Sequence, residues 1–289
     1  MKVIDRNGVY YETYDTTDKF LKDVYSFEST RACMKVLTSP FVSKAAGIAL
    51  DSGVSAAFIE KFAETHDIDL FDFEQTEYAS FNDFFTRRFK KGRRMIDDRE
   101  EALICPCDGN VTAYSIAKSD MFVIKNTVYS VHSLLRDRKL AKKYAGGNAV
   151  IIRLTAADPH RYVFPCGGIK SHDRHISGML NVTRPVTSEF EAVYKENTRE
   201  YCMIRNPQLG DIIMMEVGSL GAGRIRNFED GAAKIQKGEE KGVFDFGGST
   251  IILLTRSDKV NICADLLENT RRGLETKLRM GEVIGLTAE

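Results

Sequence analysis

The change in hydrophobic periodicity near residue 100 is the feature that most restricts how this 289-residue chain can fold. Between residues 17 and 64, apolar side chains recur at helical spacing, as at Phe58, Ile59 and Phe62. Beyond residue 100, short apolar runs of strand length alternate with glycine-bearing turns, as in 150–152 and 251–254. Helices followed by many strands predict an α+β protein with a helical N-terminal part and a mainly antiparallel β core.

The same boundary predicts two units. Residues 1–98 form an N-terminal arm and a helical, membrane-associating subdomain, and residues 99–289 form a β-rich catalytic domain. The segment from Ser249 onward is predicted to form a strand, a helix and a closing strand. We therefore expect this C-terminal segment to be woven into the β core.

Composition excludes several classes of protein. Forty-one basic side chains balance forty-one acidic ones, so no overall field attracts nucleic acid. The start of the chain has no apolar signal region, and no apolar run reaches the length of a spanning helix. The six cysteines form no Cys-x-x-Cys pair, so we expect reduced thiols and no metal site. These features predict a cytoplasmic protein.

Two local segments are candidates for contact with a membrane surface. Residues 41–50 are apolar and rich in small side chains, which is typical of helix packing and also of a segment at a bilayer interface. Residues 84–94 combine basic side chains with Phe84, Phe85 and Phe89. That combination is typical of a solvated helix end, and it also suits docking against anionic headgroups.

Gly247-Gly248-Ser249-Thr250 directly precedes the apolar run 251–254. In such a setting the serine hydroxyl can attack the preceding carbonyl and turn the Gly248–Ser249 amide into an ester. β-Elimination then cuts the chain and leaves a dehydroalanine, which hydrolyses to a pyruvoyl group. Glycine suits this chemistry because it accepts unusual backbone angles and allows close approach. The alternative for these residues is an ordinary turn that enters a strand.

Self-cleavage needs a base near Ser249. Of the five histidines, His160 stands out because it follows the apolar strand predicted over 149–154, and a strand end can project a side chain into a site. Asp108 lies in a predicted turn between strands. Asp108, His160 and Ser249 together supply the parts of a relay in which a carboxylate orients an imidazole that deprotonates a hydroxyl.

These motifs resemble those of the phosphatidylserine decarboxylases, pyruvoyl-dependent enzymes that make phosphatidylethanolamine. The resemblance covers nearly the whole chain. It rests on residues 81–87 (FNDFFTR), 106–109 (PCDG), 158–161 (DPHR), 215–218 (MEVG) and 237–250 (KGEEKGVFDFGGST). The last of these motifs is highly specific, whereas the Asp-Gly turn alone is not.

The resemblance implies roles for individual residues. Ser249 would become the pyruvoyl cofactor and Gly248 the C-terminus of the long chain, while Asp108, His160 and Asp158 match residues of the active site. The implied reaction converts phosphatidylserine to phosphatidylethanolamine and CO2 through a Schiff base with the pyruvoyl group, which acts as an electron sink. The implied partners are the phospholipid, the cytoplasmic face of the membrane, and the long and short chains of one precursor; a homo-oligomer stays open.

Val163 departs from the family pattern. Family members commonly have Tyr-His-Arg and a second histidine three residues after the first, whereas this chain has Pro159 before His160 and Val163 at the second position. Either His160 serves both maturation and decarboxylation, or one step is altered; His172 or His175 would be the substitutes. Two alternatives remain: a pyruvoyl-dependent decarboxylase of a free amino acid, and an uncleaved, non-catalytic relative that binds lipid or protein.

Overall fold

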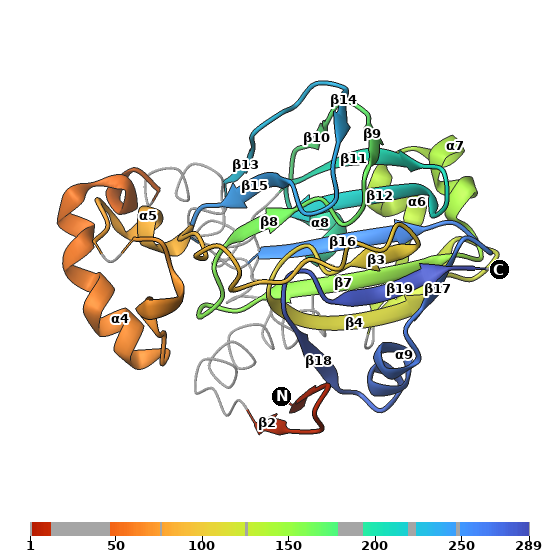
Figure 1. The fold of residues 1–289 in the computed structure, drawn as a ribbon. Coiled ribbons are helices and arrows are strands. Elements are labelled where there is room, and N and C mark those ends of the chain that lie inside the picture. The colour runs from red at the N-terminus through yellow and green to blue at the C-terminus, as the bar shows by residue number, and fades with distance from the viewer. Residues whose placement is uncertain are drawn as a thin grey trace, which may run out of the picture.

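The computed structural model describes residues 2–12, 47–75, 77–124, 127–178, 193–218, 224–246 and 249–288. Most of the predicted segment 41–50 lies outside these residues, as do both glycines at 247 and 248. Helices of the N-terminal part lie at one end of a β core (Figure 1). The predicted α+β class with a mainly antiparallel sheet is confirmed.

An eleven-stranded sheet forms the centre of the molecule. Its strands in spatial order are β14 (Ala233–Ile235), β9 (Gly168–Lys170), β11 (Arg199–Asn206), β12 (Gly210–Val217), β16 (Ser249–Thr255), β7 (Asn148–Leu154), β4 (Gly109–Ser115), β18 (Glu275–Leu278), β1 (Lys2–Asp5) and β2 (Tyr10–Glu12), with β10 (Arg174–Ile176) beside β11. Among these pairs only β1 and β18 run parallel.

Smaller sheets and helices surround this centre. The smaller sheets are β13 (Ile225–Asn227), β15 (Glu240–Phe244) and β8 (Arg161–Val163); β17 (Val260–Ile262), β19 (Val283–Thr287) and β3 (Ala102–Ile104); and β5 (Met121–Ile124) with β6 (Thr127–Ser130). The helices of this part are α6 (Val131–Leu135), α7 (Arg138–Ala141), η3 (Lys142–Tyr144), α8 (Val193–Glu196) and α9 (Ala264–Arg271).

β16 is buried on both faces. Ile251 and Leu253 pack into one apolar cluster, and Ile252 and Leu254 pack into another on the opposite face. Because successive side chains of a strand point to opposite faces, burial on both sides requires an unbroken apolar run. β16 lies between β12 and β7, so the prediction that the C-terminal segment is woven into the core is confirmed.

The N-terminal part contains η1 (Gly53–Phe58), α4 (Ile59–Thr65), η2 (Leu70–Asp72) and α5 (Phe81–Phe85). Ser80 caps α5 by accepting a hydrogen bond from the N–H of Asp83. Phe84 and Phe85 are only 0% and 2% exposed. Neither of the two interpretations of residues 84–94, a solvated helix end or a patch that docks on headgroups, holds for these two rings, because they form an apolar cluster between α5 and α4.

Strand pairing crosses the boundary predicted at residue 98. β1 pairs with β18, and β2 pairs with β1, so residues 2–12 belong to the central sheet by strand pairing. Parallel pairing of β1 with a strand near the C-terminus joins segments more than 270 residues apart. Local periodicity carries no information on such pairing.

Candidate active site

The amino end of β16, the carboxyl end of β7 and the amino end of β4 lie side by side. Ser249 of β16 pairs with Leu154, the last residue of β7. On the other side of β7, Asn110 of β4 pairs with Arg153. Because two strand spacings separate β16 from β4, the backbones of Ser249 and the Asp108 turn lie about 10 Å apart across the end of β7.

Ser249 is fully buried at this edge of the sheet. The bond predicted to be cut lies between the described residues Phe246 and Ser249, while Gly247 and Gly248 themselves lie outside the described residues. Figure 1 shows that β16 begins on the side of the core that faces α5. The predicted nucleophile therefore lies near the junction of the helical part and the β core.

His160 is buried and held by contacts on several sides. The backbone N–H of His160 donates to the backbone carbonyl of Phe85 at 3.0 Å, and the backbone carbonyl of His160 accepts from the backbone N–H of Phe244 at 2.9 Å. The imidazole stacks on the Phe85 ring with centroids 3.8 Å apart. Nδ1 lies 2.9 Å from the backbone oxygen of Asp158. Because a carbonyl oxygen only accepts, Nδ1 carries the hydrogen and Nε2 keeps its lone pair.

Burial also sets the charge of His160. Loss of hydration in this position lowers the pKa of His160 to about 3, and the nearby Arg87 guanidinium acts in the same direction. The imidazole is therefore neutral at physiological pH. A neutral ring with a free Nε2 lone pair is able to accept a proton.

Asp158 follows the end of β7 and is held by Thr155. One carboxylate oxygen of Asp158 accepts hydrogen bonds from the N–H and the hydroxyl of Thr155, both at 2.7 Å. Burial, together with the negative charge of Asp108, raises the pKa of Asp158. The Asp158 carboxyl therefore holds a proton more readily than an ordinary aspartate does.

Asp108 binds Arg94 and does not contact His160. Nε of Arg94 lies 2.8 Å from Oδ1 of Asp108, and Nη2 lies 2.5 Å from Oδ2. The guanidinium stacks on Phe89, 3.7 Å from the ring centroid. Asp108 also accepts the N–H of Met280. The expected relay in which Asp108 orients His160 is thus not formed, because the carboxylate is bound by a guanidinium and His160 is oriented by a backbone carbonyl.

The predicted substitutes for a second histidine lie elsewhere. Val163 is buried in β8, and its N–H donates to the carbonyl of Pro106 at 2.9 Å. His172 and His175 are exposed, and Nδ1 of His175 lies 3.0 Å from Glu200. Neither of these histidines lines the cleft beside the Asp108 turn. Of the five histidines, only His160 is buried.

A cleft of about 330 Å³ opens beside these residues. Asp108, Asp158 and Pro159 form part of its wall, so two of the predicted site residues face it. Its remaining lining residues are Asp67, Ile68, Asp69, Asp72, Phe73, Arg87, Phe89, Arg94, Ala157, Lys277, Leu278 and Arg279. The cleft is thus lined by both cationic and anionic side chains.

Sequence comparison assigns the chain to a family. Residues 81–286 match the phosphatidylserine decarboxylase family. The chain belongs to this family. It is 38% identical to phosphatidylserine decarboxylase proenzyme 2 of Clostridium acetobutylicum over 98% of this chain and 97% of that protein. It is 38% identical to the proenzyme of Fusobacterium nucleatum over 86% and 85%, and 40% identical to that of Chlamydia trachomatis over 72% and 70%.

The family motif 81–87 has a structural role that sequence reasoning missed. Arg87 is 1% exposed, lies between the rings of Phe73 and Phe84, and donates to the carbonyl of Ala157 beside Asp158. Burial lowers the pKa of Arg87 to about 10, so the guanidinium remains charged. In the sequence, Arg87 and Arg94 belong to the basic and aromatic run 84–94, whose composition is typical of an exposed segment. Only their neighbours in the fold identify them as parts of the cleft wall.

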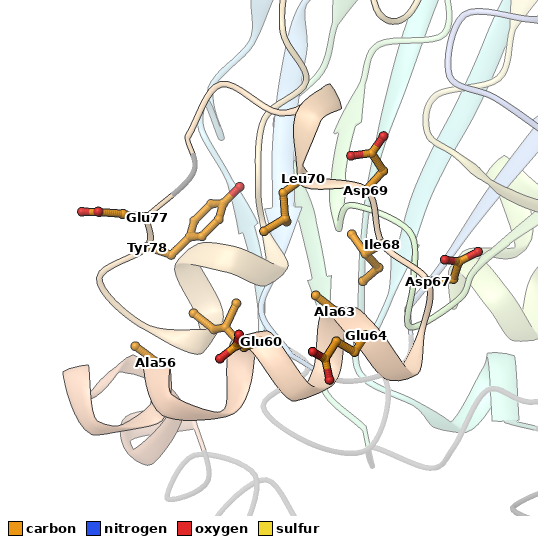
Figure 2. Close-up of a pocket in the computed structure, with 11 residues that line it drawn as sticks. Ala56, Glu60, Ala63, Glu64, Asp67, Ile68, Asp69, Leu70, Glu77 and Tyr78 are labelled. Carbon is orange, nitrogen blue, oxygen red and sulfur yellow. The ribbon is translucent and has the colours of Figure 1, made fainter.

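A larger hollow of about 570 Å³ on the helical part adjoins this cleft, because Asp67, Ile68 and Asp69 line both. Figure 2 shows α4 along one wall, with Ile68, Leu70 and Tyr78 facing it. Five carboxylates, from Glu60, Glu64, Asp67, Asp69 and Glu77, line the same hollow. Since none of the candidate residues of this decarboxylase lies there, we assign the chemistry to the smaller cleft.

Two properties of the described residues bear on cofactors and membranes. In that part of the chain, His, Cys, Asp and Glu side chains nowhere form a group of three that could hold a metal ion. None of the helices described is both long and apolar enough to cross a bilayer.

Proposed function

We propose that this chain converts phosphatidylserine to phosphatidylethanolamine and CO2, using a pyruvoyl group formed from Ser249. Family membership supports the reaction and the phospholipid substrate. The observation that carries the assignment to Ser249 is its complete burial at the sheet edge where β4, β7 and β16 meet. A buried position fits a reactive ketone, because exclusion of water limits side reactions.

Maturation begins with the hydroxyl of Ser249. In our proposal, Nε2 of His160 accepts the hydroxyl proton while the oxygen attacks the carbonyl carbon of Gly248. The Gly248–Ser249 amide bond breaks, the released nitrogen takes a proton, and an ester joins the two residues. Removal of the α-proton of Ser249 then expels the Gly248 carboxylate and leaves a dehydroalanine. Addition of water and loss of ammonia leave the pyruvoyl group.

Decarboxylation uses the same surroundings. Once formed, the pyruvoyl group would supply an electron sink for the carbanion left when CO2 departs. The Asp158 carboxyl, whose pKa is raised, can hold and return a proton beside the cleft, whereas the neutral His160 can take a proton only in passing. Arg94 holds the Asp108 carboxylate in a fixed position in the wall of the cleft.

Intact-mass spectrometry of the purified protein beside Ser249→Ala tests the proposal. The wild type should give two chains cut between Gly248 and Ser249, with the pyruvoyl mass on the short chain, whereas Ser249→Ala should give one full-length mass. His160→Gln should also accumulate uncut chain, because glutamine cannot take the hydroxyl proton. A single full-length mass for the wild type would favour the non-catalytic alternative.

The substrate is tested on the cleaved wild type. Vesicles containing phosphatidylserine should yield phosphatidylethanolamine and CO2, and Ser249→Ala should be inactive. Cleaved protein without lipid turnover would contradict the substrate. Turnover of a free amino acid in the absence of lipid would instead support the soluble-substrate alternative.

We also propose that the protein is cytoplasmic and binds the membrane face peripherally. Val54, Phe58 and Phe71 of the helical part are 80%, 63% and 65% exposed, and exposed apolar side chains suit contact with a bilayer surface. Vesicle flotation should recover the wild type with phosphatidylserine vesicles. Val54→Ser with Phe58→Ser should reduce recovery, and recovery equal to that of the wild type would contradict the role of these side chains.

A further inference from the structure

We infer that Asn82 is a positioning residue for self-cleavage, through which the helical part holds the chain that enters the bond to be cut. Asn82 is 3% exposed and lies in α5. Its Oδ1 accepts the N–H of Phe246, two residues before Gly248, at 2.9 Å. This inference rests on the proposed cleavage between Gly248 and Ser249.

A closed series of polar contacts surrounds this hydrogen bond. Nδ2 of Asn82 donates to Oδ1 of Asp51 at 2.8 Å, and Oδ2 of Asp51 lies 3.8 Å from Nη2 of Arg224. Nε of Arg224 lies 2.7 Å from the carboxylate of Asp245, which Nε of Arg226 contacts from the other side at 2.9 Å. Asp245 is 1% exposed. Asp245 and its neighbour Phe246 are therefore fixed by both the helical part and β13.

Apolar contacts reinforce the same attachment. The ring of Phe246 packs edge-on against Phe81 at 5.2 Å and Phe85 at 5.0 Å, measured between ring centroids. Phe85 also stacks on His160, as described above. The short helix α5 thus contacts both His160, the proposed base, and Phe246, which lies upstream of the bond that His160 would help to break.

Fixing both flanks matters because the attack is intramolecular. Ser249 is held in β16 between two strands, and Phe246 is held on α5. The rate then depends on how often the Ser249 hydroxyl and the Gly248 carbonyl meet in a reactive geometry, and small displacements cost large factors in rate. After cleavage Phe246 is no longer connected to Ser249. The role of Asn82 should therefore be confined to maturation.

The first experiment measures the decay of full-length protein by intact mass after synthesis. Asn82→Ala should cleave at least about ten-fold more slowly than the wild type, because it releases the N–H of Phe246. Asn148→Ala is the matched control: its Nδ2 bonds the carbonyl of Val260 at the opposite end of β7. Asn148→Ala should cleave at the wild-type rate. Equal rates for Asn82→Ala and the wild type would overturn the inference.

An exchange of the two polar groups tests the contact itself. Asn82→Asp alone places two carboxylates side by side at Asp51 and should slow cleavage. Adding Asp51→Asn supplies an amide donor for one oxygen of the new carboxylate at position 82, while its other oxygen accepts the N–H of Phe246. Cleavage should therefore recover. Failure of the exchange to recover, in protein with a normal melting transition, would contradict the role of the hydrogen bond. This pair also decides the question if Asn82→Ala does not fold.

Turnover of the mature enzyme separates positioning from general damage. The cleaved fraction of Asn82→Ala should decarboxylate phosphatidylserine, per short chain, within roughly two-fold of the wild-type rate. A loss of turnover as large as the loss of cleavage would show that the whole site is distorted and would refute the inference. Absence of cleavage in the wild type would instead refute the proposed function, so the two failures are distinguishable.

Discussion

At the scale of single residues, burial decides how His160 titrates. Its pKa is about 3 in the folded chain and close to 6.5 when unfolded. Between these values the unfolded chain binds the extra proton and the folded chain does not. The folded state therefore loses stability as pH falls below 6.5, by up to about 1.4 kcal/mol per pH unit from this one group.

Urea unfolding at pH 7.5 and pH 5.5 measures this contribution. The Ser249→Ala background keeps the chain uncut. In that background, the free energy of unfolding should fall between pH 7.5 and pH 5.5, and the fall should be about 1 kcal/mol smaller in the protein that also carries His160→Gln. Glutamine has no proton to gain over this range. An equal loss in both proteins would mean that His160 does not resist protonation in the folded state.

The Arg94–Asp108 pair is a second effect at this scale. Both side chains are nearly buried, at 13% and 10% exposure, and the pair is bidentate. Removal of either partner leaves a poorly hydrated charge. Asp108→Asn in the Ser249→Ala background should therefore lower the unfolding free energy by about 3 kcal/mol, as measured by urea unfolding.

A double-mutant cycle checks that this cost belongs to the pair. Arg94→Met with Asp108→Asn should cost less than the sum of the two single substitutions, because no unpaired charge remains. Additive losses would indicate that the two side chains contribute independently.

At the scale of elements, a buried ion pair joins β12 to β15. Nζ of Lys241 lies 2.9 Å from Oε1 of Glu216 and 3.5 Å from Asp173, and both members of the main pair are at most 1% exposed. Burial raises the pKa of Glu216 to about 7. The positive charge of Lys241 opposes this rise, and the negative charges of Asp173 and Glu200 add to it. β15 leads into the chain before Ser249, and β12 pairs with β16.

Lys241→Met should destabilise the Ser249→Ala protein by about 3 kcal/mol at pH 8, and by less at pH 6. Without the ammonium group, the pKa of Glu216 rises further above its unfolded value. The stability that this group contributes is then present at low pH and lost as pH rises through the folded pKa. Urea unfolding at both pH values measures the difference. Adding Glu216→Leu should recover most of the loss at pH 8, and no recovery would argue against an unpaired carboxylate as the cause.

At the scale of the whole molecule, residues 249–288, which the proposed cleavage would leave in the short chain, are part of the core. β16 is buried along its whole length, β18 pairs with β4 and β1, and β19 pairs with β3. These contacts are mainly strand pairing and apolar packing, which salt does not screen.

The cleaved protein should elute from size exclusion as one species that contains both chains, in 0.1 M salt and equally in 1 M salt. The higher concentration shortens the electrostatic screening length roughly three-fold, which should not separate chains held by strand pairing and apolar packing. Denaturant should separate the chains, and mass spectrometry of the eluted peak identifies them. Loss of the short chain in native buffer would contradict its central place in the sheet.

The amino-acid sequence by itself determined the fold class and the main core strands. Continuous apolar runs such as 251–254 predict strands buried on both faces. These are local properties, encoded in neighbouring residues, so a single sequence is sufficient to show them. Self-cleavage at Ser249 stays a prediction, which rests on the resemblance of residues 237–250 to a family motif.

Only the tertiary structure decided which side chains meet. It buried Phe84 and Phe85, paired Asp108 with Arg94 and left His160 oriented by the carbonyl of Asp158. It also joined β1 to β18 and attached Phe246 to α5. The physical reason is that contacts between distant segments depend on strand order and packing, whereas periodicity and motif spacing describe only the local chain.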